Sequence, residues 1–246
     1  MTTEASGSGD LSRTLDLLWN SAPRPSRGPK PGLTLDQIVE AAIAVADAEG
    51  LEAVTMRRVA TELGRGAMSL YRYVPGKAEL LDLMLDRVQR PYDPEFLGEG
   101  WRAALEALAH GTLALYRDHP WLIQVNQTRP VLGPSAIESL ERVVTRLTPM
   151  GLPDPELISA IIMIDNYVIG AARGQMYQRD AERKTGMTDD EFWTAQVPYI
   201  ERAMATGNYP TMAGLSEDAF GAFDHFTFGL RRILDGLQAY VDERAR

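Results

Sequence analysis

The stretch MSLYRYVPGK at 68–77 gathers aromatic and basic side chains around a Pro-Gly break. Ser69 and Tyr71 offer hydroxyl groups, and Arg72 and Lys77 offer cations, all of which can bind the phosphates of a nucleic acid. Lys77 also stands where a helix can begin, and the free N–H groups at a helix N-terminus favour an anion. The residue types and their spacing predict a surface that holds phosphate groups.

The sequence around this stretch, TMRRVATELGRGAMSLYRYV, can position it as a helix-turn-helix. A helix at 55–63 would end at Gly64, which permits a tight turn. Leu70 and Tyr73 would then pack back on that helix from a second one at about 67–73. The outer face of such a second helix enters the major groove of DNA. An ordinary helical hairpin has a similar apolar pattern and stays open as an alternative.

A helix precedes this pair, and another follows it. Thr34 and Gln37 form a capping box before LDQIVEAAIAVADAE, and Gly50 ends that helix. A further helix is expected at 77–90. These elements together predict a small three-helix head joined to a fourth helix.

The segment SAPRPSRGPKPG at 21–32 is rich in proline and contains no acidic residue. Arg24, Arg27 and Lys30 are three residues apart, so they share one edge of a polyproline II helix. We expect residues 1–32 to be a flexible arm, with residues 1–20 mobile, whose basic edge contacts DNA. A solvated linker is the alternative interpretation.

Charge is unevenly distributed along the 246 residues, whose formal net charge is −9. Residues 21–77 hold eight basic and six acidic residues, so the excess of acid lies elsewhere. Local charge decides which face meets an anion. The absence of cysteine excludes disulfides. The N-terminus lacks a secretory h-region, and no apolar run approaches the roughly 20 residues of a membrane span, so a cytoplasmic protein is expected.

The rest of the chain also reads as helices, at 97–118, 120–126, 135–149, 155–182, 189–206 and 217–243. Ser135 with Glu138 and Thr188 with Glu191 repeat the capping-box pattern, and Asp154 is an expected N-cap before a proline. The predicted fold class is all-α, with an N-terminal three-helix helix-turn-helix DNA-binding domain at 33–80. A larger helical domain for ligand binding and dimerisation follows at 81–246.

Residues 33–85 resemble the DNA-binding domain of the TetR family of bacterial transcriptional regulators, through TMRRVATELG, MSLYRYVPGK and ELLDLML. The resemblance implies phosphate contacts for Tyr71, Lys77 and Thr55, with Arg57 and Arg58 in the same turn. Arg65 departs from the family pattern, which has an apolar residue there. The expected DNA-binding residues are Arg24, Arg27, Lys30, Thr55, Arg57, Gly66, Ala67, Met68, Ser69, Tyr71, Arg72 and Lys77.

Residues 101–176 and the last helix are loosely similar to the ligand-binding domain of the tetracycline repressors. Asn166 stands where a histidine is expected, so a magnesium–tetracycline chelate is not the expected effector. Polar or aromatic residues among the apolar helices are candidates to bind another small molecule: Trp101, Tyr116, Trp121, Asn126, Arg129, Asp165, Asn166, Tyr167 and Arg173.

Two helices carry wide apolar stripes, which can serve a core and a partner helix together. The resemblance implies that they pair with their copies in a homodimer. The expected interface residues are Leu157, Ile161, Ile164, Val168, Phe223, Leu230 and Leu237. Alternatively, both apolar stripes pack only in the core of their own chain and form no dimer interface.

Enzyme motifs are missing from the sequence. None of the three histidines forms a metal pair at i+4, and there is no G-x-S-x-G, P-loop or Rossmann fingerprint. Asp82 and Asp86 share a helix face, which we interpret as solvated. We expect no catalytic residue, no metal and no cofactor. The hypothesis is a homodimeric repressor that binds a palindromic operator on double-stranded DNA and is released by a small molecule. A ligand-independent regulator and an all-α enzyme are the alternatives.

Overall fold

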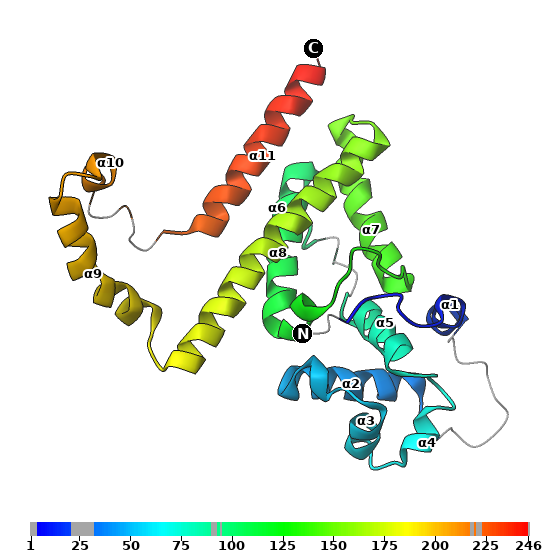
Figure 1. The fold of residues 1–246 in the computed structure, drawn as a ribbon. Helices are drawn as coiled ribbons and strands as arrows, with labels where there is room; N and C mark the ends of the chain where they lie inside the picture. The colour runs from blue at the N-terminus through cyan, green and yellow to red at the C-terminus, as the bar shows by residue number, and fades with distance from the viewer. Residues whose placement is uncertain are drawn as a thin grey trace.

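The computed structural model describes residues 4–20, 32–89, 93, 95–216, 219 and 223–245. Within these ranges the regular elements are helices, and one isolated parallel bridge joins Ala5 to Asn126. A small head lies at one end of the molecule, and a larger set of helices lies above it (Figure 1). The predicted all-α class, with a helix-turn-helix head followed by a larger helical domain, is confirmed.

The head consists of α2 (Leu35–Glu49), the 3-10 turn η1 (Leu51–Ala53), α3 (Met56–Glu62) and α4 (Ala67–Leu70). The predicted capping box is present, because Gln37 N donates to Thr34 Oγ1 and Thr34 N donates to Gln37 Oε1. Ile38, Val59 and Leu70 are fully buried and fix the three helices on one another. These side chains belong to one continuous cluster of buried residues that extends from the head into the larger domain.

Helix α4 is shorter than the predicted 67–73. Regular helix stops at Leu70, and a turn follows in which Tyr73 N and Val74 N both donate to Leu70 O, at 2.8 and 3.0 Å. Pro75 disfavours helical geometry at the residue before it, which ends the element early. The second helix of the helix-turn-helix is thus a single helical turn, followed by a hydrogen-bonded turn at 71–73.

Helix α5 (Lys77–Val88) leads from the head into the larger domain. The interpretation of Asp82 and Asp86 as a solvated face is wrong, since their residues are only 2% and 9% exposed. Asp86 Oδ1 accepts from Ala136 N at 3.1 Å and so caps the start of α7 (Pro134–Leu147). This tertiary cap replaces the predicted capping box of Ser135 and Glu138.

The expectation that residues 1–20 are mobile is wrong for residues 4–20. They form a short extended segment and α1 (Leu11–Asn20), which packs on α5. Thr14 is fully buried, and Leu17 and Leu18 pack against the core. We call residues 4–19 the strap. Polar contacts to residues distant in sequence hold the strap in place, and the apolar face of α1 packs against the core.

The larger domain contains α6 (Gly100–Asp118), the 3-10 segment η2 (Pro120–Gln124), α7, η3 (Thr148–Met150) and α8 (Asp154–Thr185). It ends with α9 (Asp189–Ala205), α10 (Pro210–Ala213) and α11 (His225–Arg244). The Thr188–Glu191 capping box is present. Asp154 is the first residue of α8, and Pro153 takes the N-cap position predicted for it. Helix α11 begins later than the predicted 217.

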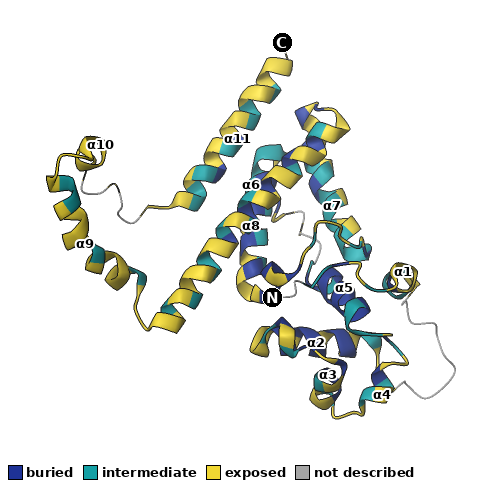
Figure 2. Cartoon of the chain, viewed as in Figure 1, coloured by how far each residue is buried: buried dark blue, intermediate teal, exposed yellow. Residues whose placement is uncertain are grey.

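Helix α8 is long and apolar enough to cross a membrane, which the sequence analysis did not anticipate. One face of it packs in this chain on α6, α7 and α11. Helix α9 contains no buried residue and, together with α10, projects away from the other helices (Figures 1 and 2). The molecule is therefore well packed around α5–α8 and open around α9–α11.

Candidate DNA-binding surface and effector cavity

The turn between α3 and α4 is a Schellman motif built on Gly64. Its φ of +63° is a conformation that glycine adopts without strain. Arg65 N donates to Ala60 O at 2.9 Å, and Gly64 N donates to Thr61 O at 3.0 Å. The turn holds α4 at a fixed angle to α3, as a helix-turn-helix requires.

The predicted recognition face lies on the outside of this turn. Met68 is 77% exposed and Tyr71 is 47% exposed, and Gly66 and Arg72 are also exposed. Ala67 is half-buried and packs against the core. Apart from Ala67, these side chains offer a surface of apolar, aromatic and cationic groups in the position of a recognition helix.

Ser69 is less available than the sequence analysis expected. Its residue is half-buried, and its Oγ donates to Gly66 O at 2.6 Å. The hydroxyl proton is therefore already used inside the turn, and only the oxygen lone pairs face outward. Donation from Ser69 to a phosphate would require that this bond break.

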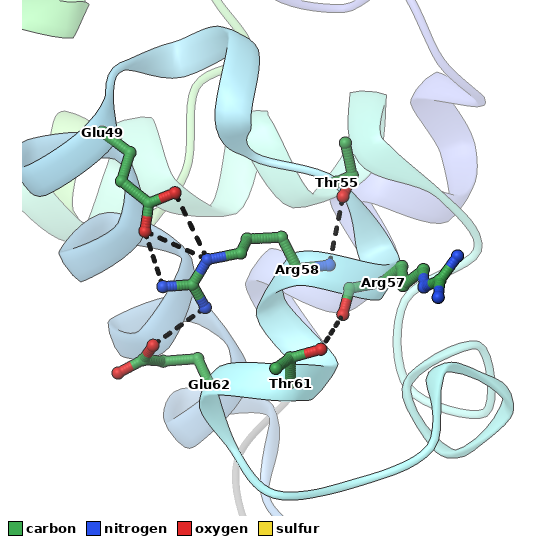
Figure 3. A network of polar contacts seen from close by, with 6 residues as sticks. All are labelled: Glu49, Thr55, Arg57, Arg58, Thr61 and Glu62. Carbon is green, nitrogen blue, oxygen red and sulfur yellow. Dashed lines mark hydrogen bonds and ion pairs between the residues drawn. The ribbon is translucent and has the colours of Figure 1, made fainter.

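Arg57 and Arg58 are neighbours at the start of α3 but have different surroundings (Figure 3). Arg58 Nη2 lies 2.6 Å from Glu49 Oε1, and Arg58 Nη1 lies 2.9 Å from Glu62 Oε2. We call this ion-paired group the brace, because it ties α3 to the end of α2. The hydrogen bond from Arg58 holds the pKa of Glu49 below its ordinary value, and the carboxylates raise the pKa of Arg58.

Arg57 points away from the brace (Figure 3) and is exposed. Thr55 Oγ1 accepts from Arg58 N at 3.1 Å as the N-cap of α3. Its hydroxyl proton is still available for a phosphate. The structure thus separates a structural arginine from one placed for binding, which two adjacent arginines in a sequence do not reveal.

Arg65, the departure from the family pattern, has a structural contact. Its Nη2 donates to Gly32 O at 2.8 Å and so ties the turn to the residues that precede α2. Arg24, Arg27 and Lys30 lie outside the described residues.

Lys77 is the first residue of α5, as predicted, and lies shortly after the turn that follows α4. Its ammonium group, however, has a partner within the protein. Nζ lies 2.9 Å from Glu4 Oε1 and donates to Leu51 O at 3.3 Å. No pattern in the sequence indicates this pairing, because Glu4 belongs to a segment expected to be mobile.

A cavity of about 400 Å³ lies between α6, η2 and α8. Its walls combine apolar side chains with a charged rim, formed by Tyr116, Arg117, Pro120, Ile123, Ala172, Gln175, Met176, Arg179, Asp180, Glu182 and Arg183. Of the predicted ligand-binding residues, Tyr116 lines it. The other cavity residues carry no distinctive sequence pattern, because two helices far apart in sequence create the space.

Trp121 has a different place from the one expected. Its Nε1 donates to Asp47 Oδ1 at 2.8 Å, and His119 Nδ1 lies 2.8 Å from the same oxygen. We call this contact the latch, since it links η2 to α2 of the head. Pro120 and Ile123, which line the cavity, belong to the same short 3-10 segment. The latch therefore lies directly beside the cavity wall.

The remaining predicted ligand-binding residues are not gathered into one site. Tyr167 stacks on Phe226 with ring centroids 5.5 Å apart, and its hydroxyl donates to Phe226 O. Asn126 pairs with the strap. Trp101 is half-buried on α6, and four others are exposed in the protomer: Arg129, Asp165, Asn166 and Arg173.

The predicted dimer stripe is largely buried inside the protomer. Leu157, Ile164, Val168 and Leu230 are buried, and Ile161 and Leu237 pack partly on the same core. Of the expected interface residues, Phe223 is exposed. The large apolar side chains of α8 and α11 that are exposed in the protomer are Ile158, Ile162, Met163, Tyr177, Phe228 and Tyr240.

Two family models match the chain. "Bacterial regulatory proteins, tetR family" matches residues 38–84, and "Tetracyclin repressor-like, C-terminal domain" matches residues 94–241. The chain is 69% identical, over 98% of its length and 91% of the relative, to the HTH-type transcriptional repressor DrrR1 of Streptomyces coeruleorubidus. It is 31% identical, over 90% of its length and 91% of the relative, to an HTH-type transcriptional regulator of Saccharopolyspora erythraea.

Solved structures share the fold. ActR of Streptomyces coelicolor, in complex with actinorhodin, matches with a TM-score of 0.65 and 28% identity over 85% of this chain and 96% of that one. Apo ActR matches with a TM-score of 0.62 and 27% identity over 88% of this chain and 100% of that one. With its helix-turn-helix head and its helical C-terminal domain each matched, the chain belongs to the TetR family of bacterial transcriptional regulators.

Proposed function

We propose that the protein is a homodimeric repressor that acts in the cytoplasm, binds a palindromic DNA operator and is released by a small molecule. The observation that carries the proposal is the exposed surface of Arg57, Met68, Tyr71 and Arg72 on a helix-turn-helix that is fully braced behind it. An identity of 69% to a repressor supports the direction of regulation. The DNA-binding residues of the sequence analysis are retained, with Ser69 in a lesser role.

The dimer is proposed from the apolar side chains that the protomer leaves uncovered. Ile162 of α8 is 53% exposed and Phe228 of α11 is 53% exposed. Exposure of this kind over long helices marks an interaction surface. We assign it to a second copy of the chain and not to a membrane. Two heads related by a two-fold axis would read half-sites with centres about 34–36 Å apart, or somewhat more.

The effector is proposed to bind the cavity between α6, η2 and α8. Its apolar wall suits an aromatic body, and Arg117, Arg179 and Arg183 at its rim suit polar oxygen substituents. The structure of ActR in complex with actinorhodin, at 28% identity, supports a ligand-binding role for this domain. A ligand that displaces η2 would also displace Trp121 and, through Asp47, helix α2 of the head. The latch is thus the proposed route from cavity to head.

The DNA contact is tested by comparing two neighbouring arginines. Operator fragments would first be selected from genomic DNA with the full chain. Arg57→Ala should then weaken operator binding by about tenfold per dimer and reduce the salt slope by about two, since two phosphates would no longer have a cationic partner. The melting temperature should not change.

Arg58→Ala is the matched control, because it removes the same charge one residue away. It should lower the melting temperature by releasing the brace and change the salt slope less than Arg57→Ala does. Equal salt slopes for the two variants would contradict the assigned binding surface.

The effector site is tested in the same operator assay with a panel of aromatic compounds that includes actinorhodin. A compound that releases the wild-type protein should be needed at higher concentration by Gln175→Trp, which narrows the cavity. Operator affinity without compound should be the same for both proteins. Release of both proteins at the same concentration would place the effector elsewhere.

A further inference from the structure

The strap bridges the two domains at the point where the head meets the larger domain. Asn126 N donates to Glu4 O at 2.8 Å, and Ser6 N donates to Asn126 O at 3.1 Å, on either side of the bridge at Ala5. On the opposite side, Ser6 Oγ donates to Asp82 Oδ1 at 2.7 Å. Glu4 is therefore held by backbone hydrogen bonds at a defined place.

Further contacts anchor the strap along the first turns of α5. Gly7 N donates to Asp82 at 3.1 Å, and Asp10 N donates to Glu79 Oε1 at 2.9 Å. A Cβ atom at Gly9 would crowd the carboxyl group of Glu79 and lie 3.1 Å from Ala78 Cβ, so glycine suits this close approach. The strap is thus built to lie against the N-terminal half of α5, the helix that begins at Lys77.

The carboxylate of Glu4 occupies the position beside Lys77 that a phosphate would need. The Lys77 Nζ to Glu4 Oε1 distance is 2.9 Å, and the two side chains are 28% and 37% exposed. A carboxylate oxygen at this distance makes the same charge-assisted hydrogen bond that a phosphate oxygen would make. Because the pair is partly open to solvent, a phosphate can reach the ammonium and replace Glu4.

The residues that form the strap lie outside the family domains. The model of the DNA-binding domain begins at residue 38, and the C-terminal model begins at residue 94. The strap thus precedes the segments that the two family models match, and the match to the DrrR1 repressor covers 98% of the chain.

We propose that Glu4 is an internal competitor of the operator for Lys77, and that it lowers operator affinity in the free protein. The proposal rests on the proposed phosphate contact of Lys77. When DNA binds, the lysine exchanges a carboxylate for a phosphate, so the free energy of breaking the old pair offsets part of the gain from the new one. The displaced Glu4 then stays near the DNA backbone, where its negative charge is repelled. Because Asn126 holds Glu4, the larger domain sets the position of the competitor.

The test is a double-mutant cycle with Glu4→Gln and Lys77→Ala in the full chain, measured by operator titration at several salt concentrations. Glu4→Gln should raise operator affinity by about 2-fold to 30-fold per dimer, as expected for two exposed ion pairs removed. The log–log salt dependence should become steeper. In the Lys77→Ala background, Glu4→Gln should have only the small effect of a general charge change.

Glu243→Gln supplies that general effect, because it changes the net charge equally at the end of α11, away from the head (Figure 1). Melting temperatures of all variants check that the strap stays in place. Unchanged affinity for Lys77→Ala would contradict the phosphate contact itself. If Lys77→Ala weakens binding and Glu4→Gln behaves like Glu243→Gln, the competition is wrong. An equal gain from Glu4→Gln in both backgrounds would indicate simple repulsion and would also overturn it.

Discussion

The head and the α8–α11 half of the molecule differ in where their large apolar side chains lie. Between residues 33 and 80, the large apolar side chains left exposed are Met68 in α4 and Tyr71 in the turn that follows it. From α8 to α11 the exposed set is far larger: Ile158, Ile162, Met163, Tyr177, Met187, Phe192, Trp193, Val197, Tyr199, Ile200, Tyr209, Met212, Leu215, Phe223, Phe228 and Tyr240.

This contrast indicates that the head is structurally complete in one chain and that the other half is not. Apart from Met68 and Tyr71, the large apolar residues of the head are buried or packed against the core, and the brace ties α3 to α2. An exposed side chain there is consequently a candidate for binding. An exposed apolar side chain in α8–α11 instead indicates a surface that a partner covers. Exposure of an apolar side chain thus indicates a candidate DNA contact in the head and a candidate protein interface in α8–α11.

The largest expected effect comes from a charge placed on that uncovered face. Ile162→Glu should give a folded monomer, with unchanged helix content, because Ile162 is exposed in the protomer and an interface does not tolerate an unpaired charge. Operator affinity should fall at least about 100-fold, because one head loses the second head's contribution. Sedimentation at micromolar concentration measures the first effect, and operator titration measures the second.

Leu230→Glu is the matched control from the predicted stripe. Leu230 is fully buried within the protomer, so this charge should cost more than the about 2–5 kcal/mol of a core leucine truncation and unfold the chain. A dimeric Ile162→Glu protein, or a folded monomeric Leu230→Glu protein, would reverse the assignment of the two faces.

An intermediate effect is expected from the proline-rich segment at 21–31, whose basic residues we expect to bind DNA together with the head. Replacement of Arg24, Arg27 and Lys30 by serine should leave the melting temperature and the dimer unchanged. The salt slope should fall by up to about five per dimer, at about 0.9 for each phosphate that is no longer neutralised. An unchanged slope would identify the segment as a linker.

Deletion of residues 1–31 is a different experiment, because it also removes the strap. Ser6 is 9% exposed and Thr14 is fully buried, and both make hydrogen bonds that the deletion would break. The melting temperature should therefore fall, in contrast to the serine variant. Equal melting temperatures for the two variants would contradict the packing of the strap.

Local signals in the sequence predicted what local geometry decides. The capping box of Thr34 and Gln37 and the glycine turn at Gly64 depend on neighbours within a few residues, and both are present. The family motif around Tyr71 and Lys77 lies within residues 38–84, which the family model of the DNA-binding domain matches. The fold class and the candidate DNA-binding surface follow from these features.

Contacts between distant residues were not predictable in the same way. Trp121 reaches Asp47 across 74 residues, and Asp86 caps a helix about 50 residues away. No local pattern encodes either pairing. Much of the predicted dimer stripe is buried within the protomer, because an apolar heptad shows that a face is buried and does not show whether the protomer or a partner buries it. Leu230 is buried in the protomer, whereas Ile162 is exposed there.

The head meets the larger domain at α5, and the smallest expected effect concerns Asp82, which joins the strap to that helix. Burial raises the pKa of Asp82, while the hydrogen bonds from Ser6 and Gly7 oppose the shift. The folded protein thus holds this proton more tightly than the unfolded chain does. Its contribution to the free energy of unfolding is greatest below the ordinary aspartate pKa of about 4 and declines as the pH rises through the raised value.

Asp82→Asn does not titrate. The melting temperature of Asp82→Asn minus that of the wild type should consequently become more positive between about pH 4 and pH 7, with Glu243→Gln as the baseline. Parallel curves of melting temperature against pH for the variant and the wild type would show that Asp82 has the same pKa in the folded and the unfolded chain. The carboxyl group under the strap would then be as hydrated as in the unfolded chain.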